Sequence, residues 1–514
     1  MPGTTSIVVM HRPTRPTTVG ELAGAVRGLV TEVRGDPETK VCGLAYDSRS
    51  VKERDLFFCI VGHLSDGHIH APEAVAAGAG ALCSERPLAL PAAQIVVSDA
   101  RRAMALMAAE FFGRPADDLL LLGVTGTNGK TTTAYLLDSI LRASGHTTGL
   151  VGTVETRIAG TSKPGVRTTP ESLDLQQLFA EMRDAGVTAG AMEVTSHALV
   201  LSRVEGVRFS AAGFTNLSQD HLDFHKDMED YFAAKRALFT PERAERGAVN
   251  ADDPYGRRLL TESRIPCASF GMGPDAAVRA EEVSLQVRAT EFTLVWPGGA
   301  ERIRSRLVGR FNVLNCLAAA TVALEAGIGI HAIARGLGSA EPVPGRFESI
   351  DAGQPFTVVC DYAHTPDSLN NVLASARGLA AGNGGRVLCV FGAGGDRDRR
   401  KRPLMGSAAA RHADVVILTS DNPRNEDPMA IISEVLEGVV AERTQGADAV
   451  LEDRGAAIRA ALEEARPGDV VVIAGKGHET GQEIAGRKLP FDDREVARGV
   501  LADLGWRRPV PSGA

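Results

Sequence analysis

The residues best suited to chemistry form a glycine-rich loop that ends in a lysine and three threonines. It reads Gly126-Thr127-Asn128-Gly129-Lys130-Thr131-Thr132-Thr133, between an apolar strand (119–124) and a helix that starts near Thr131. Backbone N–H groups of such a loop, with the N-terminus of the next helix, form a cradle for phosphate. Lys130 adds charge toward the β- and γ-phosphates, and the Thr131 hydroxyl can bind Mg²⁺. We predict a nucleoside triphosphate here. The alternative is a chance glycine-rich turn, since Val124 stands where the general P-loop pattern has its first glycine.

Three further side chains stand where an α/β protein could use them. Glu193 ends a predicted strand (188–194), the edge at which such sheets bind ligands, although a solvated carboxylate is the plainer interpretation. His221 lies near Asp223 and His225, which could equally form an ordinary polar loop. Lys235 lies on a predicted helix, where a lysine is normally a surface residue with its stem on apolar neighbours.

A second group of polar residues follows predicted strands near the C-terminus. Asp421-Asn422-Pro423-Arg424 comes after the strand 415–419, and by itself this is a proline turn capped by an aspartate. Arg397 in GGDRD, and Gly475 and Glu479 in GKGHE, follow neighbouring strands. A planar guanidinium pairs with a carboxylate through two hydrogen bonds, and a glutamate can pair with an ammonium.

The elements that must position these groups predict an α/β protein of three domains. Alternating strands and helices favour a mainly parallel sheet in the centre, and strands at 356–360, 386–391, 415–419 and 469–474 favour a Rossmann-like third domain. The third domain lacks the full GxGxxG fingerprint, so NAD binding is not expected. Two proline-containing linkers, near Pro115 and Pro342–Gly345, mark the boundaries. The predicted limits are a flexible tail (1–20), a small mixed domain (21–116), a central domain (117–342) and a C-terminal domain (343–514).

Composition narrows the class of protein. The 514 residues carry a net charge of −8, which gives no reason to expect a nucleic-acid partner. The seven cysteines form no CxxC pair, so we expect neither a disulfide framework nor a structural zinc site. No apolar run is long enough to span a membrane. We expect a cytoplasmic monomer without membrane insertion.

The loop GTNGKTTT resembles the ATP loop of the Mur ligase family, and further matches run in order along nearly the whole chain after residue 45. They are MEVTSHAL, TNLSQDHLDFH, YFAAKRALF, GRFN, DYAHTP, FGAGGDRD, DNPR and GKGHE. Several motifs in the right order are far more specific than one. The resemblance implies an ATP-dependent carboxylate–amine ligase of peptidoglycan synthesis, with ATP and Mg²⁺ as cofactors.

The resemblance also implies roles for single residues. Lys130, Glu193, His221 and Lys235 would be catalytic, with Thr131, Glu193, His221 and a carbamylated Lys235 (N6-carboxylysine) around Mg²⁺. Such a carbamate needs a neutral amine, so the pKa of Lys235 should be depressed. Asn312 and Asn315 would lie near the adenine, although a helix-capping role is as good an interpretation of Asn312. Arg346, Asp361 and His364 would contact ATP from across the cleft.

The substrates follow from the same resemblance. DNPR matches the Mur ligases that add meso-diaminopimelate, an amino acid with one more carboxylate than lysine, and the predicted diaminopimelate site is Arg397, Asp421, Asn422, Pro423, Arg424, Gly475 and Glu479. The acceptor would be UDP-MurNAc-L-Ala-D-Glu, bound by Ser48, Arg49, Asp66, His68, Thr168, Thr169, Ser196 and Arg203. Two alternatives remain open: a Mur-type ligase that adds another amino acid, and a nucleotide-dependent switch protein.

Overall fold

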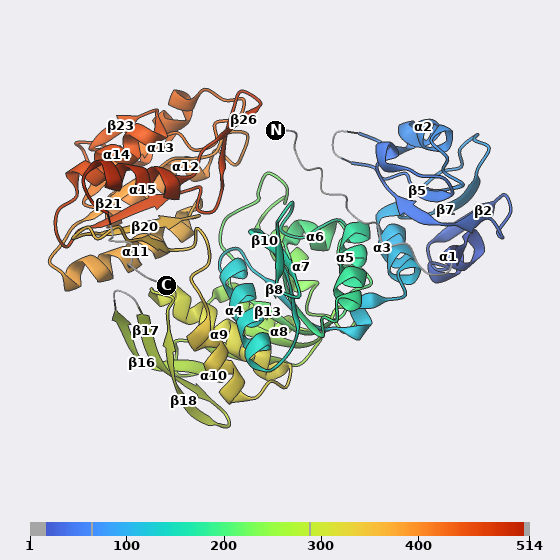
Figure 1. The fold of residues 1–514 in the computed structure, drawn as a ribbon, viewed down its shortest axis with the longest axis horizontal. Helices are drawn as coiled ribbons and strands as arrows, with labels where there is room; N and C mark the ends of the chain where they lie inside the picture. Colours follow the sequence, from blue (N-terminus) through green and yellow to red (C-terminus); the bar gives the residue numbers. More distant parts are fainter. Residues whose placement is uncertain (1–16, 63–64, 287–288, 508–514) are drawn as a thin grey trace.

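The computed structural model describes residues 17–62, 65–286 and 289–507, which form three sheet-containing parts in a row (Figure 1). The N-terminal and C-terminal parts lie at opposite ends of the molecule, and the central part lies between them. Most of the predicted tail (1–20) lies outside the described residues. Its last four residues are described: Thr17–Thr18 form a strand and Val19 begins a helix, so residues 17–20 belong to the folded part and not to a flexible tail.

The N-terminal part contains a five-stranded sheet in the order β2-β7-β6-β5-β4, with a small two-stranded sheet, β1-β3, beside it. Its elements are β1 (Thr17–Thr18), α1 (Val19–Ala25), β2 (Val30–Arg34), β3 (Lys40–Val41), β4 (Gly43–Ala45), β5 (Asp55–Phe58), α2 (Ala71–Ala76), β6 (Ala81–Ser84), β7 (Ala93–Val97) and α3 (Ala100–Phe111). Helix α1 ends at Ala25, and Val30 already begins β2, which pairs with β7.

The central part is built on an eleven-stranded sheet in the order β11-β10-β9-β12-β8-β13-β14-β15-β16-β17-β18. Its strands are β8 (Leu120–Thr125), β9 (Thr148–Val151), β10 (Glu155–Ile158), β11 (Thr161–Pro164), β12 (Ala189–Glu193), β13 (Phe209–Phe214), β14 (Ala244–Asn250), β15 (Cys267–Gly271), β16 (Val278–Gln286), β17 (Ala289–Trp296) and β18 (Gly299–Ser305). Its helices are α4 (Lys130–Ala143), α5 (Ser172–Asp184), α6 (Ser196–Val200), α7 (Met228–Arg236), α8 (Pro254–Glu262), α9 (Arg310–Glu325) and α10 (Ile330–Ser339).

This sheet is parallel in its middle and antiparallel at both ends. Strands β9, β12, β8, β13, β14, β15 and β16 run parallel, and hairpins extend the sheet at each side. The middle strand β8 reads LLLGVT and is almost wholly buried, as expected of a strand covered on both faces. One face packs on α4, α9 and α10, and the other on α5 and α7. The prediction of an α/β protein with a mainly parallel central sheet is confirmed.

The C-terminal part has a six-stranded sheet in the order β19-β20-β24-β21-β22-β23, parallel except for the edge strand β19. Its elements are β19 (Glu348–Ile350), β20 (Thr357–Asp361), α11 (Pro366–Gly382), β21 (Val387–Phe391), α12 (Lys401–His412), β22 (Val415–Thr419), α13 (Pro428–Glu442), β23 (Ala449–Leu451), α14 (Arg454–Glu464), β24 (Val470–Ala474), β25 (Gly481–Ile484), β26 (Arg487–Pro490) and α15 (Asp493–Asp503). Helices cover both faces of this sheet.

The N-terminal part is joined to the central part by a shared apolar core. Leu173 and Ala180 of α5 pack with residues of α1, α3 and β7, and the Tyr46 hydroxyl donates to Asp174 at 2.6 Å. Contacts between the central and C-terminal parts near the glycine-rich loop are polar: Asn128 Nδ2 donates to Asp367 at 2.8 Å, and Gln219 to Asp398 at 3.3 Å. The predicted domain limits fall between the three sheets and stay predictions. Among the described residues, no helix is long and apolar enough to cross a membrane.

Candidate active site

The glycine-rich loop occupies the carboxyl end of β8 and leads directly into α4. Gly126 has φ 148°, and a Cβ there would lie 1.9 Å from the Thr215 hydroxyl, so no other residue fits. Thr215 follows β13 and donates to Asn128 O at 2.6 Å, and Asn216 Oδ1 accepts the Asn128 N–H at 2.9 Å. The ends of two neighbouring strands therefore fix the loop, with the first amides of α4 available for an anion.

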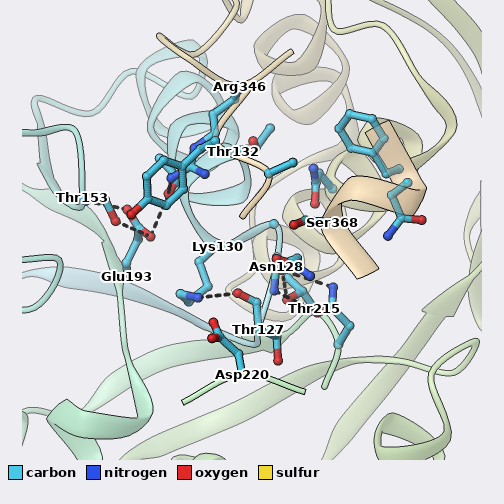
Figure 2. A pocket seen from close by; sticks show the side chains of 18 of the residues that line it. Thr127, Asn128, Lys130, Thr132, Thr153, Glu193, Thr215, Asp220, Arg346 and Ser368 are labelled. Carbon is cyan, nitrogen blue, oxygen red and sulfur yellow. Dashed lines mark hydrogen bonds between the residues drawn. The ribbon is translucent and has the colours of Figure 1, made fainter. Parts of the chain in front are cut away.

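Lys130 and Thr131 begin α4 and line a large cavity, and Figure 2 shows Lys130 beside the loop. The Lys130 ammonium donates back to Gly126 O at 2.9 Å and Thr127 O at 2.8 Å. Burial lowers the pKa of Lys130, against the effect of Glu193 and Asp220. The structure thus brings the predicted ATP residues of the loop together.

Glu193 ends β12 and is buried, with its carboxylate surrounded by neutral donors. Figure 2 shows Thr153 beside Glu193: Thr153 N donates to Oε1 at 2.7 Å, and the Thr153 hydroxyl donates to Oε2 at 3.1 Å. The Thr131 hydroxyl also donates to Oε2, at 2.9 Å. The Arg346 guanidinium, from the C-terminal part, donates to Thr131 Oγ1 at 3.1 Å. A carboxylate and a hydroxyl at this spacing are oxygen ligands of the kind that Mg²⁺ prefers. Thr153 was not predicted, because it lies 40 residues before Glu193.

Lys235 lies on α7 and is 1% exposed. Its ammonium donates to Gly126 O at 2.7 Å, the same carbonyl that Lys130 uses, and lies 4.6 Å from the centre of the Tyr231 ring. Burial, with the nearby Lys130 charge, lowers the pKa of Lys235 well below its usual value. The structure therefore contradicts the ordinary surface-lysine interpretation and agrees with the expected depressed pKa.

His221 also lines the cavity, in a loop where its backbone adopts φ 55°. Its Nε2 lies 3.4 Å from Asp220 Oδ2, and its ring meets the His197 ring edge-on at 4.9 Å. Burial lowers the pKa of His197 to about 4, so that ring is neutral near neutral pH. Within the described residues there is no group of three or more His, Cys, Asp or Glu side chains arranged to hold a metal ion. A metal at Thr131 and Glu193 would need other donors as well.

The cavity, of about 810 Å³, continues onto the C-terminal part, which supplies Arg346, Asp361 and His364. The Asp361 carboxylate accepts the N–H groups of Phe347 and Ala363 at 2.6 and 2.7 Å, and burial raises its pKa to about 6. Burial lowers the pKa of His364 to about 4. Asn315 lines this cavity. Asn312 does not: it donates to Val308 O at 2.9 Å and lines a separate hollow, so a structural role at the helix start fits it better.

The DNPR and GKGHE segments meet at the carboxyl ends of β22 and β24. Asn422 Nδ2 donates to Glu479 Oε2 at 2.9 Å. Arg424, with φ 53°, donates through Nη1 to Gly395 O at 2.7 Å and lies 3.1 Å from Glu483 through Nε. Gly475 has φ 120°, and a Cβ there would lie 3.2 Å from Asp421 Oδ2. The predicted residues Asp421, Asn422, Pro423, Arg424, Gly475 and Glu479 therefore form one corner, while Arg397 is exposed and lines the large cavity.

Models of Mur ligase domains match each of the three parts of the chain. A Mur ligase middle domain matches residues 124–323, a Mur ligase glutamate ligase domain matches 345–477, and a Mur ligase family catalytic domain matches 40–112. A Solibacter usitatus (strain Ellin6076) protein, UDP-N-acetylmuramoyl-L-alanyl-D-glutamate--2,6-diaminopimelate ligase, is 50% identical over 95% of this chain and 99% of its own. The chain belongs to the Mur ligase family.

Solved structures agree with this membership. A structure of a UDP-N-acetylmuramoyl-L-alanyl-D-glutamate--2,6-diaminopimelate ligase is 30% identical, with a TM-score of 0.67 over 96% of this Mur ligase and 100% of that chain. The MurF ligase of Thermotoga maritima, in complex with ADP, is 18% identical, with a TM-score of 0.62 over 90% and 97% of the two chains. The second likeness shows the shared fold.

In the N-terminal part of this Mur ligase, the predicted uridine residues are tied to neighbours. Ser48 donates to Glu73 at 3.0 Å, and Arg49 pairs with Asp47 at 2.6 Å. Asp66 caps the turn that contains His68 and accepts from its Nδ1 at 2.6 Å. His68 is buried, and its Nε2 accepts the Glu85 N–H at 3.1 Å, so the proton that Asp66 accepts lies on Nδ1.

The predicted acceptor residues of the central part divide in two. Thr168, Thr169 and Arg203 line the large cavity, and Arg203 pairs with Glu171 at 2.7 Å. Ser196 does not line the cavity, although its neighbours Thr195 and His197 do, and its buried hydroxyl is hydrogen-bonded to His225 at 2.9 Å. Sequence reasoning missed Arg167, which also lines the cavity and pairs with Glu171 at 2.6 Å.

Proposed function

We propose that this Mur ligase uses ATP to join meso-diaminopimelate to the D-Glu γ-carboxylate of UDP-MurNAc-L-Ala-D-Glu, in the cytoplasm, for peptidoglycan synthesis. The observation that carries the proposal is the corner where Asn422, Arg424 and Glu479 meet. It offers a guanidinium for a carboxylate and a carboxylate for an ammonium, which are the groups at the distal end of diaminopimelate. The relatives named as 2,6-diaminopimelate ligases support the same choice of amino acid.

The chemistry needs an activated carboxylate. The acceptor carboxylate attacks the γ-phosphorus of ATP, ADP leaves, and the amine then attacks the acyl phosphate and displaces phosphate. Lys130 and the amides that begin α4 would hold the phosphates, while Arg346 would hold them from across the cavity. Closure of the parts on one another would keep water from the acyl phosphate.

Mg²⁺ fits the oxygen atoms of Thr131 and Glu193, with His221 as a third candidate ligand. When bound, it would offset the charge that develops on the phosphates. We also propose that Lys235 is carbamylated. Its depressed pKa favours a neutral amine, which can attack CO₂ and lose a proton to give a carbamate. This change would replace a buried ammonium next to Lys130 with an anion.

The first experiment is phosphate release from ATP in the presence of UDP-MurNAc-L-Ala-D-Glu, with meso-diaminopimelate, with L-lysine, or with no amino acid. We expect turnover with diaminopimelate alone. Equal turnover with L-lysine would leave the ligase and overturn the choice of amino acid. Hydrolysis of ATP that needs no amino acid would instead favour a nucleotide-dependent switch.

A further inference from the structure

Lys476 lies in the GKGHE segment, but it is not among the residues predicted to bind diaminopimelate. Its side chain is completely buried, directly behind the residues of the predicted diaminopimelate site. A buried ammonium is costly unless its three N–H groups find acceptors. The acceptors of the Lys476 ammonium therefore indicate its role.

The ammonium has acceptors on both segments of the corner. It donates to Asn422 Oδ1 at 2.9 Å and to Glu479 Oε2 at 3.1 Å. Asp421 Oδ1 lies 3.7 Å from it, buried and without a hydrogen-bond partner among the described residues. Lys476 thus links the DNPR loop, after β22, to the GKGHE loop, after β24.

These bonds fix how Asn422 is oriented. Its Oδ1 accepts from Lys476 and from the Glu483 N–H at 3.0 Å, and both of these groups can only donate. The amide nitrogen must therefore point the other way, where it donates to Glu479 Oε2 at 2.9 Å. An ammonium and an amide thus hold one oxygen of Glu479.

The second oxygen of Glu479 is left for a ligand. No hydrogen bond from the described residues reaches Oε1, and 31% of this side chain is exposed. Burial alone would raise the pKa of Glu479, but Lys476 and the bond from Asn422 bring it below its usual value. The carboxylate is therefore ionised and held in one orientation before substrate arrives.

We propose that Lys476 is a positioning residue for the amino-acid substrate: its ammonium orients Asn422 and Glu479 so that Glu479 Oε1 receives the distal ammonium of the substrate. Lys476 itself does not touch the substrate. The inference rests on the proposed function. It adds a role for a buried lysine behind the predicted binding residues. A second buried cation, Arg454, has its Nη2 near Gly475 and pairs with Asp493 at 2.7 Å.

The test is steady-state phosphate release by the full chain carrying Lys476→Met, which keeps the length of the stem and removes the charge. We expect KM for meso-diaminopimelate to rise about 10-fold or more, as the loss of a charge-assisted contact predicts. KM for ATP and kcat should change less than about twofold, because the lysine acts on the amino acid alone. Lys40→Met, at an exposed lysine of β3, is the matched control.

A double-mutant cycle separates positioning from general damage. In the Glu479→Gln background, Lys476→Met should raise KM for diaminopimelate less than about threefold, because the group through which it acts is gone. Full additivity, an unchanged KM in the single variant, or an equal rise in KM for ATP would overturn the proposal. A wild-type protein that releases phosphate without diaminopimelate would overturn the proposed function instead, which is a separate outcome.

A crystal structure of the wild-type protein with diaminopimelate does not depend on any variant folding. We expect Lys476 to keep its contact with Glu479 Oε2 while Oε1 contacts the distal ammonium. A Glu479 side chain that leaves Lys476 to reach the substrate would refute the positioning role.

Discussion

Replacing Arg424 by alanine tests the predicted amino-acid specificity most directly. The side chain is 24% exposed, donates to Gly395 O at 2.7 Å, and pairs with a Glu483 side chain that is 48% exposed. An ion pair this open contributes about 0–1 kcal/mol, and one hydrogen bond about 1 kcal/mol, so Arg424→Ala should cost at most about 2 kcal/mol of stability. Urea denaturation checks this value.

The loss of activity should be larger and selective. A guanidinium that binds a carboxylate through two hydrogen bonds contributes about 3 kcal/mol, which is about 100-fold in kcat/KM. We expect that fall for meso-diaminopimelate. L-Lysine lacks the distal carboxylate, so its kcat/KM should change less than about threefold. The measurement is phosphate release with each amino acid at saturating ATP and acceptor.

Two results would refute this reasoning. An equal fall in kcat/KM for both amino acids would mean that Arg424 supports the structure of the whole site and does not bind the distal carboxylate. Unchanged activity would mean that the carboxylate binds elsewhere, with exposed Arg397 as the next candidate. Arg424→Gly is the matched control, because glycine adopts φ 53° without strain: it should lose the same activity as alanine and be at least as stable as Arg424→Ala.

Three further predictions concern buried ionisable groups. Removing bicarbonate and CO₂ should lower the activity of the wild type and adding bicarbonate should restore it, whereas Lys235→Met should be inactive at any bicarbonate concentration; a wild-type rate indifferent to CO₂ would exclude the carbamate. Arg454→Met should lower the free energy of unfolding by about 3–5 kcal/mol in urea, because it strands the buried Asp493; a change below about 1 kcal/mol would contradict that. The His364 pKa of about 4 lies below the usual value of 6.5, so the contribution of neutral His364 to stability is present above pH 6.5 and is lost as pH falls toward 4. His364→Gln should therefore flatten the dependence of the urea midpoint on pH between 6.5 and 4. An unchanged slope would contradict this prediction.

Local patterns predicted the elements that carry the site better than the contacts within it. Strand β8, the loop and α4 follow from an apolar run, glycines and a helix start, so Lys130 could be placed from the sequence. Glu193 could be placed because it ends the predicted strand that became β12. The donors around Glu193 could not, because Thr153 reaches it across 40 residues of chain. The orientation of Asn312 could not be predicted either, because the packing of α9 decides which of its first residues face the cavity.

The hairpins at the edges of the central sheet were also missed. Strands β16, β17 and β18 carry charged, exposed residues between buried ones and hold no site residue that a motif would mark. Their pairing is antiparallel, which an expectation of alternating strands and helices does not include. The C-terminal strands were easier, because β20, β21, β22 and β24 are continuous apolar runs.

The place of α5 in two cores bears on how the molecule can be divided. Leu173 and Ala180 lie in the core of the N-terminal part, while Leu175 and Phe179 of the same helix lie in that of the central part. A shortened chain that begins at residue 117 would lack the N-terminal part and would therefore expose the face of α5 that carries Leu173 and Ala180. The central sheet does not cover this apolar face, and its exposure favours aggregation. Residues 17–342 form the smaller piece that keeps both cores whole, so the ATP-binding part should be produced together with its N-terminal neighbour.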